Sequence, residues 1–236
     1  MVSAVIKNWD NKTWLSSQDY IKSFNNFLTK NIKLNSKSKV LDIGCGRGKI
    51  IGALSSKLRL KSKPVGIDIL NHKDKDKRIK FKKIDASSFH FKKNDKFDLI
   101  LIKQTIHLLK LNEIKRLLSI LKKNLKPNGR IFIFTLDSNE NELPTFNLMK
   151  IKLLNSLERD KKILKLIKEI YPKSLKKRFI YKVNIIKKDY LKMIQKRYIS
   201  TLLFLTGKEL LKGMKEINSK YRNNIKFNDK LTCIIL

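Results

Sequence analysis

The sequence predicts a single α/β domain with a mostly parallel β-sheet and helical insertions in its C-terminal half. Short apolar segments alternate with helical segments through the first part of the chain, as is typical of βαβ units with right-handed crossovers. The chain has 236 residues, of which 42% are hydrophobic, so it can bury one sizeable core. It has only 8 Gly and 4 Pro, which excludes a fibrous or largely disordered chain.

The first half of the chain predicts alternating helices and strands. Residues 19–32 carry apolar side chains at helical spacing, whereas the run at 97–103 is almost continuously apolar, as expected for a central parallel strand covered on both faces. Lys-Pro-Asn-Gly at 126–129 predicts a turn. The expected order is helix 19–32, strand 40–43, a helix through 50–58, strands 64–69, 79–85 and 97–103, helix 112–125 and strand 130–136.

The second half of the chain is mainly helical. Residues 144–171 are predicted to form a long helix, and 179–185 to return as a strand. Two further helices are expected at 189–198 and 208–221, followed by a last strand at 230–236. No internal repeat or low-complexity linker divides the chain, so one domain is expected.

The charge of the chain is strongly positive. Lys and Arg number 55 against 20 Asp and Glu, which gives a net charge of +35 and would ordinarily suggest a nucleic acid or an anionic membrane as partner. Only 9 of these residues are Arg and 46 are Lys, spread along the whole sequence, whereas dedicated nucleic-acid surfaces favour the planar fork of Arg. Both a solvated Lys surface and a polyanionic partner such as RNA stay open, the first being favoured.

The cysteines and the apolar runs indicate the compartment. Cys45 and Cys233 lie far apart, which argues against a disulfide framework and a multi-cysteine metal site. No apolar run approaches the ~18 residues that would span a bilayer, and the N-terminus breaks into polar residues too early for a signal peptide. We therefore expect a soluble cytoplasmic protein with no transmembrane segment and no metal. The sequence gives no oligomeric state.

Three glycines mark the most informative segment. Gly44, Gly46 and Gly48 stand between a predicted strand and a predicted helix, where they allow a tight turn and a close approach to a ligand. The helix that follows offers free N–H groups to an anion. A dinucleotide fingerprint would need a third glycine at Lys49, and the Walker pattern is absent. The spacing therefore favours a ligand other than NAD or a nucleoside triphosphate.

Val-Leu-Asp-Ile-Gly-Cys-Gly-Arg-Gly at 40–48 resembles motif I of the class I S-adenosylmethionine-dependent methyltransferases. The resemblance continues, in the order of that family, through 66–69, 84–86, 97–101 and 125–134, and it covers roughly residues 18 to 136. It implies a Rossmann-like sheet of seven strands, mostly parallel with the last one antiparallel, and a helical cap. The division that follows is a cofactor-binding core at 18–136, a cap and substrate region at 137–226 and a last strand at 227–236.

The resemblance also implies roles for individual residues. Gly44, Cys45 and Gly46 would surround the methionine part of S-adenosylmethionine, and Asp42 would hold the loop and the ligand ammonium, through water. Asp68 would accept both ribose hydroxyls. Asp85 would accept from the adenine amino group. The full set of expected cofactor-binding residues is Asp42, Gly44, Cys45, Gly46, Asp68, Ile69, Asp85, Ala86 and Lys103. The alternatives are a solvated strand end for Asp68, a turn or helix cap for Asp85 and a small space-filler for Cys45.

Gln104 and His107, which follow the 97–103 strand, are the candidate catalytic residues. Open α/β sheets bind ligands at this carboxyl edge, and small-molecule members of the family often carry a His facing the substrate near this point. A neutral His packed in the core is the alternative for His107. The segment lacks the Asn/Asp-Pro-Pro-Tyr/Phe run of members that act on base or amide nitrogen. Its absence counts against those acceptors.

The segments 187–203 and 207–217 resemble the cap helices of small-molecule carboxyl methyltransferases of the trans-aconitate type. Arg197, Tyr198 and Thr201 are therefore the candidate substrate residues, supplying a cation and hydroxyls to a carboxylate. At helical spacing Arg197 and Thr201 share a face, whereas Tyr198 points away.

The resemblance predicts methyl transfer to a small molecule, at a carboxylate oxygen. An RNA methyltransferase that uses the basic surface is the alternative, and a binding protein that keeps only the fold is a weaker one. Trp9 and Trp14, ahead of the first helix, are expected either to cover the cofactor or to fix the N-terminus to the core, the latter being slightly favoured.

Overall fold

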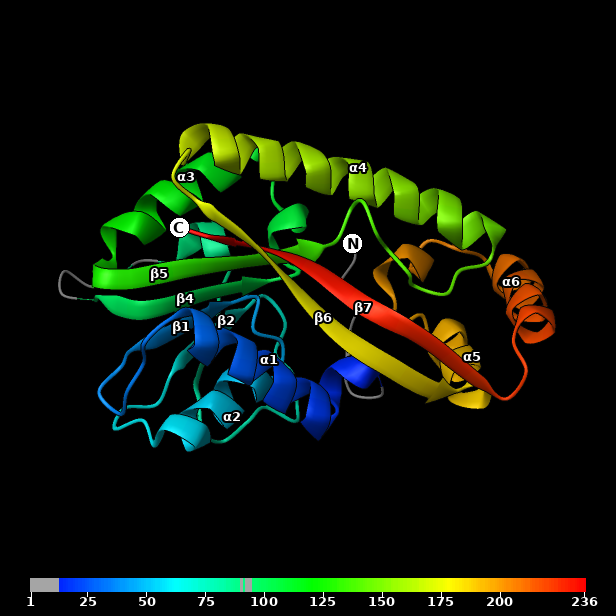
Figure 1. Ribbon diagram of the computed structural model, residues 1–236, viewed down its shortest axis with the longest axis horizontal. Helices are drawn as coiled ribbons and strands as arrows, with labels where there is room; N and C mark the ends of the chain where they lie inside the picture. Colours follow the sequence, from blue (N-terminus) through cyan, green and yellow to red (C-terminus); the bar gives the residue numbers. More distant parts are fainter. Residues whose placement is uncertain (1–12, 90, 92–94) are drawn as a thin grey trace.

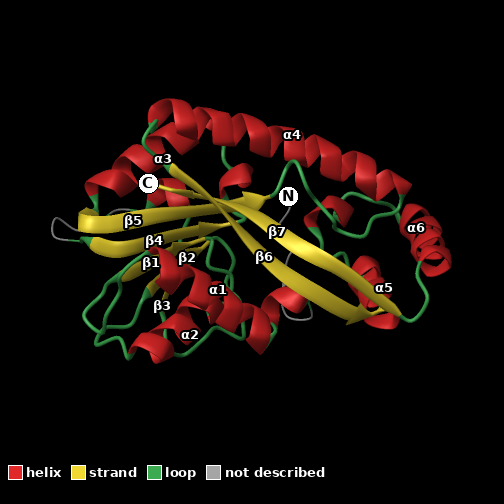
Figure 2. Cartoon of the chain, viewed as in Figure 1, coloured by secondary structure: helices red, strands yellow, loops and turns green. Residues whose placement is uncertain are grey.

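The computed structural model describes residues 13–89, 91 and 95–236 of the chain. Its central feature is a seven-stranded sheet of order β3-β2-β1-β4-β5-β7-β6, with helices on both faces (Figures 1 and 2). The pairs from β3 to β5 are parallel, and β7 is antiparallel to both β5 and β6. The α/β Rossmann-like class and the antiparallel last strand are thereby confirmed.

The elements follow the predicted order with shifted ends. The strands are β1 Val40–Ile43, β2 Val65–Asp68, β3 Lys80–Lys83, β4 Phe97–Lys103, β5 Leu125–Leu136, β6 Leu175–Ile186 and β7 Asn224–Ile235. The helices are α1 Gln18–Asn31, α2 Lys49–Leu58, α3 Leu111–Lys123, α4 Asn147–Ile170, α5 Lys187–Gln195 and α6 Gly207–Lys220. Short 3-10 helices are η2 Trp14–Ser16, η3 Ala86–Ser88, η4 Ile106–Leu108 and η5 Ser200–Leu202.

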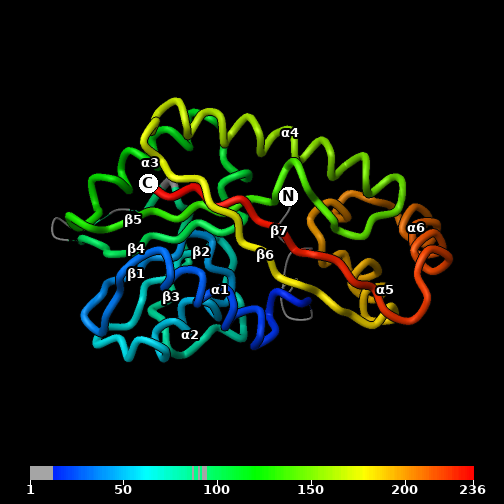
Figure 3. Tube along the Cα trace, viewed as in Figure 1, coloured from blue at the N-terminus to red at the C-terminus, as the bar shows by residue number. Residues whose placement is uncertain are grey.

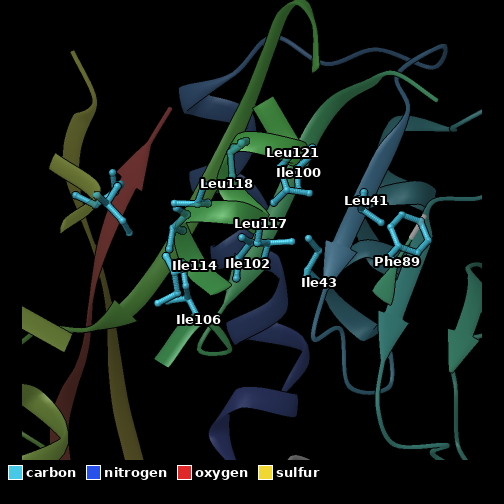
Figure 4. Packing of buried hydrophobic residues seen from close by; sticks show 14 of the residues in the cluster. Leu41, Ile43, Phe89, Ile100, Ile102, Ile106, Ile114, Leu117, Leu118 and Leu121 are labelled. Carbon is cyan, nitrogen blue, oxygen red and sulfur yellow. The ribbon is translucent and has the colours of Figure 1, made fainter. Parts of the chain in front are cut away.

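The core lies on both faces of β4, which explains its continuous apolar run. Leu99 and Leu101 point to the face covered by α1 and α2, whereas Ile100 and Ile102 point to the face covered by α3 and α4. Figure 4 shows Ile100 and Ile102 against the leucines of α3. All four side chains are fully buried. Because successive side chains of a strand point to opposite faces, a strand covered on both sides must be apolar at every position.

The β6–β7 hairpin extends well beyond the rest of the sheet. β5 pairs only with residues 231–235 of β7, whereas β6 pairs with β7 over its whole length. The projecting half of the hairpin packs with α5, α6, η5 and the first half of α4 around a second core, and Figures 1 and 3 show these elements to one side of the main sheet. We call this second packed unit the distal lobe. It contains much of the predicted cap, but it includes long strands as well as helices.

The turn predicted at 126–129 lies inside β5 as a bulge. Phe97 pairs with Leu125 and Leu99 pairs with Arg130, so four residues of β5 stand opposite the single residue Asp98. A Cβ at Gly129 would come 2.5 Å from the Phe97 carbonyl oxygen, which explains the glycine. The turn sequence is therefore absorbed as a bulge, because the chain resumes pairing with the same neighbouring strand.

Two features are absent from the described residues. No helix among them is long and apolar enough to cross a membrane. Within the same residues, no group of three or more His, Cys, Asp or Glu side chains could hold a metal ion.

Candidate active site

The loop after β1 adopts a conformation that favours glycine. Gly44, Gly46 and Gly48 have φ of +71°, +54° and +70°, in the left-handed region. A Cβ at Gly44 would also collide with the side chain of Thr105. The N–H groups of Gly44 and Cys45 both donate to the Ile67 carbonyl, at 2.9 and 3.0 Å, which fixes the loop to the end of β2. Gly48 then begins α2 without a side-chain cap.

Asp68 lies at the carboxyl end of β2 and faces this loop. Its Oδ2 accepts the Gly46 N–H at 2.8 Å and its Oδ1 accepts the Leu70 N–H at 2.9 Å. The side chain is 13% exposed, so Asp68 is an ordered acceptor rather than a solvated strand end. A carboxylate held in this way has lone pairs left for hydroxyl donors. The buried His72, with Nε2 3.9 Å from Oδ1, lies behind it and was not identified from the sequence.

Asp42 is a buried acid on β1, in the middle of the sheet edge that carries the glycine loop. Desolvation raises the pKa of its carboxyl to about 7; the charge of Lys103 lowers it and that of Asp68 raises it. The Lys103 ammonium lies over the rings of Tyr20 and Phe24, with its Nζ 5.3 and 5.6 Å from the ring centroids. A buried, incompletely compensated carboxyl of this kind suits the arrival of a second cation, such as the ammonium of an amino acid.

The other expected cofactor residues line the same edge of the sheet. Ile69 follows β2 and is 55% exposed, whereas Asp85 and Ala86 follow β3, with Asp85 exposed and Ala86 half-buried. The backbone carbonyl of Asp85 accepts the Ser88 N–H, so this residue also begins the η3 turn. The carboxyl edge of β4, β1, β2 and β3 thus carries acidic acceptors, a glycine loop and small or apolar surfaces. This set fits an adenosyl amino acid.

A cavity of about 500 Å³ lies where the carboxyl ends of β4 and β5 meet the distal lobe. Its wall is mainly apolar, and Gln104 and His107 contribute to it from the segment after β4. The predicted substrate residues Arg197, Tyr198 and Thr201 contribute from the opposite side. The structure therefore brings the candidate catalytic and substrate residues to one cavity.

The expected orientation of the substrate residues was wrong. α5 ends at Gln195 rather than continuing through 198, and Arg197 has a φ of +55°. This turn breaks the helical spacing, so residues 197–201 all line the cavity, Tyr198 included. Arg197 is held by a bond from Nη2 to the Leu205 carbonyl at 2.8 Å. Its other N–H groups are available for recognition, since a guanidinium carries five donors.

The segment after β4 connects the glycine loop with the cavity. Gln104 has a φ of +52°, and its N–H donates to the Phe134 carbonyl at 2.8 Å. The next residue, Thr105, donates from Oγ1 to the Gly44 and Lys103 carbonyls, at 3.5 and 3.1 Å. Strained backbone of this kind persists where the surroundings fix it, often at functional sites. Gln104 therefore stands between the predicted cofactor loop and the cavity.

His107 is a half-buried wall residue of the cavity. Burial lowers the pKa of its imidazole to about 4, and the positive charge of Arg159 adds to the effect. The ring is therefore neutral at neutral pH. Its predicted catalytic role stays a prediction, but a neutral imidazole can both donate and accept a hydrogen bond to an acceptor molecule.

The wall also contains residues that the sequence did not indicate, Phe227 and Asp229 of β7, and both contact Trp14. Trp14 Nε1 donates to Asp229 Oδ2 at 2.9 Å, and the Trp14 ring meets Phe227 edge-on with centroids 5.1 Å apart. Trp14 therefore fixes the start of the described chain to β7 and also lines the cavity. Trp9 lies outside the described residues. Asp160 of α4 is a further buried wall residue, and its charged neighbours in the sequence gave no signal of burial.

Comparisons with known proteins agree with this arrangement. A family profile described as methyltransferase domain matches residues 34–197. A search of curated protein sequences found no significant match. The plantazolicin methyltransferase BpumL, solved with a pentazolic desmethylPZN analogue and SAH, is 17% identical with a TM-score of 0.54, over 97% of this chain and 87% of that chain.

Two further solved structures have the same fold. A protein of Anabaena variabilis, described as a methyltransferase from an antibiotic biosynthesis pathway, is 14% identical with a TM-score of 0.60, over 89% of this chain and 95% of its own. A protein of Bacillus halodurans, also described as a methyltransferase, is 15% identical with a TM-score of 0.55, over 90% and 97%. The trans-aconitate subtype stays a prediction. The chain belongs to the methyltransferase domain family, as an S-adenosylmethionine-dependent methyltransferase of the class I fold.

Proposed function

We propose that this protein transfers a methyl group from S-adenosylmethionine to a carboxylate oxygen of a small molecule bound in the cavity. The observation that carries the proposal is the position of this cavity. Its wall includes Gln104 and His107, directly after β4, and Thr105 between them contacts the glycine loop. The two predicted binding regions therefore adjoin at one segment. BpumL, solved with a pentazolic desmethylPZN analogue and SAH, shares the fold, which supports an organic acceptor.

The cofactor side of the proposal relies on residues already described. Asp68 would accept the ribose hydroxyls, Asp42 would face the ammonium, and Gly44 and Gly46 would leave room for the methionine part. Bound S-adenosylmethionine supplies an electrophilic methyl, whose bond to sulfur breaks as the acceptor oxygen bonds to it, giving a methyl ester and S-adenosylhomocysteine. Most of the rate enhancement would then come from orientation.

The acceptor side relies on Arg197 and on the neutrality of His107. Arg197 can give two parallel hydrogen bonds to a carboxylate while it keeps its bond to Leu205. A carboxylate oxygen needs no base, because it is already ionised. This agrees with a His107 whose lowered pKa, about 4, makes it a poor proton acceptor at neutral pH. Gln104 and His107 would then orient the carboxylate by hydrogen bonds.

The test begins with binding and continues to the acceptor. In calorimetry, S-adenosylmethionine and S-adenosylhomocysteine should bind at micromolar strength, about −8 kcal/mol. Asp68→Ala should weaken both by about 1–3 kcal/mol, because two hydroxyls lose their charged acceptor. Asp189→Ala, which removes an exposed carboxylate of α5, is the matched control and should bind like the wild type.

A metabolite extract with labelled cofactor then identifies the acceptor class. The expected product is an ester, whose label is released by mild base. A label that resists base shows methylation of nitrogen, carbon, sulfur or a hydroxyl oxygen and contradicts the carboxylate. If Asp68→Ala binds the cofactor as tightly as the wild type does, the predicted contact between Asp68 and the ribose hydroxyls is wrong.

A further inference from the structure

Asp160 is a buried carboxylate in the wall of the cavity, and no contact among the described residues explains why it is buried there. It lies on α4, it is 2% exposed, and its Oδ1 has no hydrogen-bond partner among the described residues. A charged group buried without a partner opposes folding, so such groups are normally paired or bind a ligand. Asp160 therefore needs a role to explain its position.

Thr201 is a second polar group in the same condition. It lies on η5, which packs against α4, and its Oγ1 is also buried without a hydrogen-bond partner in the part of the chain that the structure describes. Both residues line the same cavity, where Leu153, Met193 and Phe227 supply apolar surface. A carboxylate only accepts hydrogen bonds, and a hydroxyl can accept as well. Two unsatisfied acceptors in an apolar wall indicate a ligand group that donates.

The charges around Asp160 leave it uncompensated. Arg159, the next residue of α4, donates from Nη2 to the Leu109 carbonyl at 2.9 Å, and Arg197 donates to Leu205. His107 on η4 is neutral at neutral pH, and Lys152 lies two turns earlier on α4. Among the described residues, no cation lies within ion-pair distance of the Asp160 carboxylate. Desolvation raises its pKa to about 6, and only the charge of Arg159 opposes this shift.

We propose that Asp160 and Thr201 together bind a protonated amino group of the acceptor. The acceptor is then a small molecule with an apolar body that carries a cationic nitrogen in addition to the group that is methylated. This inference rests on the proposed function, because it takes the cavity as the acceptor site. An ammonium donates three hydrogen bonds and supplies the missing positive charge, whereas a neutral hydroxyl would satisfy the hydrogen bonds but not the charge.

The probes for the test are hexylamine and hexanol, which share an apolar chain and differ in the head group. Binding is measured by calorimetry on the full chain saturated with S-adenosylhomocysteine. Hexylamine should bind about tenfold or more tightly than hexanol, since only the amine compensates the charge of the Asp160 carboxylate. Because the protein carries a net charge of +35, added salt should leave this binding unchanged or strengthen it.

Two variants and one control locate the effect. Asp160→Asn should weaken hexylamine by about tenfold or more, and Thr201→Val by a smaller factor. Glu158→Gln makes the same charge change on the exposed side of α4 and should have no effect. Asp160→Asn removes a buried charge, so we expect it to fold, and unchanged affinity for S-adenosylhomocysteine confirms that it has.

The pH dependence gives an independent readout. Below a pH of about 6 the Asp160 carboxyl takes up a proton in the free protein, so hexylamine binding should fall as the pH is lowered through that range in the wild type but not in Asp160→Asn. Equal binding of hexanol and hexylamine, or a preference for hexanol, overturns the inference. A protein that binds S-adenosylhomocysteine but no amine also overturns it and leaves the proposed function standing. Failure to bind S-adenosylhomocysteine overturns the proposed function instead.

Discussion

At the scale of single residues, Asp42 shows how a binding site can reduce stability. Its carboxyl has a pKa raised to about 7, mainly by desolvation. In the unfolded chain an Asp titrates near 4, so the folded state loses stability as the pH rises from about 4 to about 7, where the unfolded chain ionises first. This loss of folding stability persists at higher pH. A cofactor ammonium would offset it.

Asp42→Asn should therefore make the cofactor-free protein more stable by about 4 kcal/mol at a pH of about 8, an order-of-magnitude value from the raised pKa. The advantage should shrink as the pH falls and vanish near pH 4. Thermal unfolding over this range is the measurement. The same variant should bind S-adenosylmethionine more weakly. An Asn variant that is less stable than the wild type at high pH would show that the ionised carboxylate is well compensated in the free protein.

Arg197 allows the acceptor to be tested with a single substitution. Arg197→Lys keeps the positive charge but loses the planar fork, so KM for a carboxylate acceptor should rise about three- to tenfold while kcat changes little. Arg222→Lys, at an exposed position, is the control. Steady-state kinetics with the acceptor identified above provide the measurement. An unchanged KM would mean that Arg197 only fixes the loop through Leu205.

At the scale of elements, the turns decide where the site forms. The glycine loop places its N–H groups against Asp68 and β2 because three residues adopt positive φ. At the other side of the cavity, the loop from β5 to α4 is fixed by Asp137 and Glu140, which bind Arg178 of β6 at 3.0 and 3.1 Å. This contact holds the loop that precedes α4 against the hairpin.

Gly44→Ala should damage the loop, because its φ is +71° and a Cβ would collide with Thr105. We expect a loss of about 1–3 kcal/mol of stability and of most cofactor binding. Gly207→Ala is the matched control: nothing lies within 4 Å of its added Cβ, it begins α6 and it does not have a positive φ. Chemical denaturation and calorimetry compare the two. Wild-type behaviour of Gly44→Ala would mean that the loop adapts.

At the scale of the whole molecule, the net charge of +35 determines non-specific behaviour rather than the proposed chemistry. No contact described above needs RNA, and the cavity is mainly apolar. RNA should therefore bind weakly, without preference for sequence or structure, and its affinity should fall steeply and linearly with salt on logarithmic axes. Methyl transfer to the small acceptor should change much less. Fluorescence anisotropy with several RNAs checks this, and sequence-selective methylation of RNA at moderate salt would contradict it.

The sequence by itself determined the order of the elements, the sheet class and the glycine loop, because these depend on local patterns. A run such as 97–103 must be buried on both faces, and glycines at 44, 46 and 48 serve a turn that other residues adopt at a cost. The five matching segments of the family all lie within residues 40–134, in this part of the chain.

Only the tertiary structure decided how the cavity is assembled. Trp14 and Asp229, which are 215 positions apart, meet in its wall, and Asp160 is buried there because α4 crosses from the sheet to the distal lobe. Helical spacing misplaced Tyr198, because the positive φ at Arg197 ends α5 early. The positions of these residues depend on the long β6–β7 hairpin, which extends from the main sheet into the core of the distal lobe. Pairing between distant segments follows from packing as a whole, which local sequence patterns do not encode.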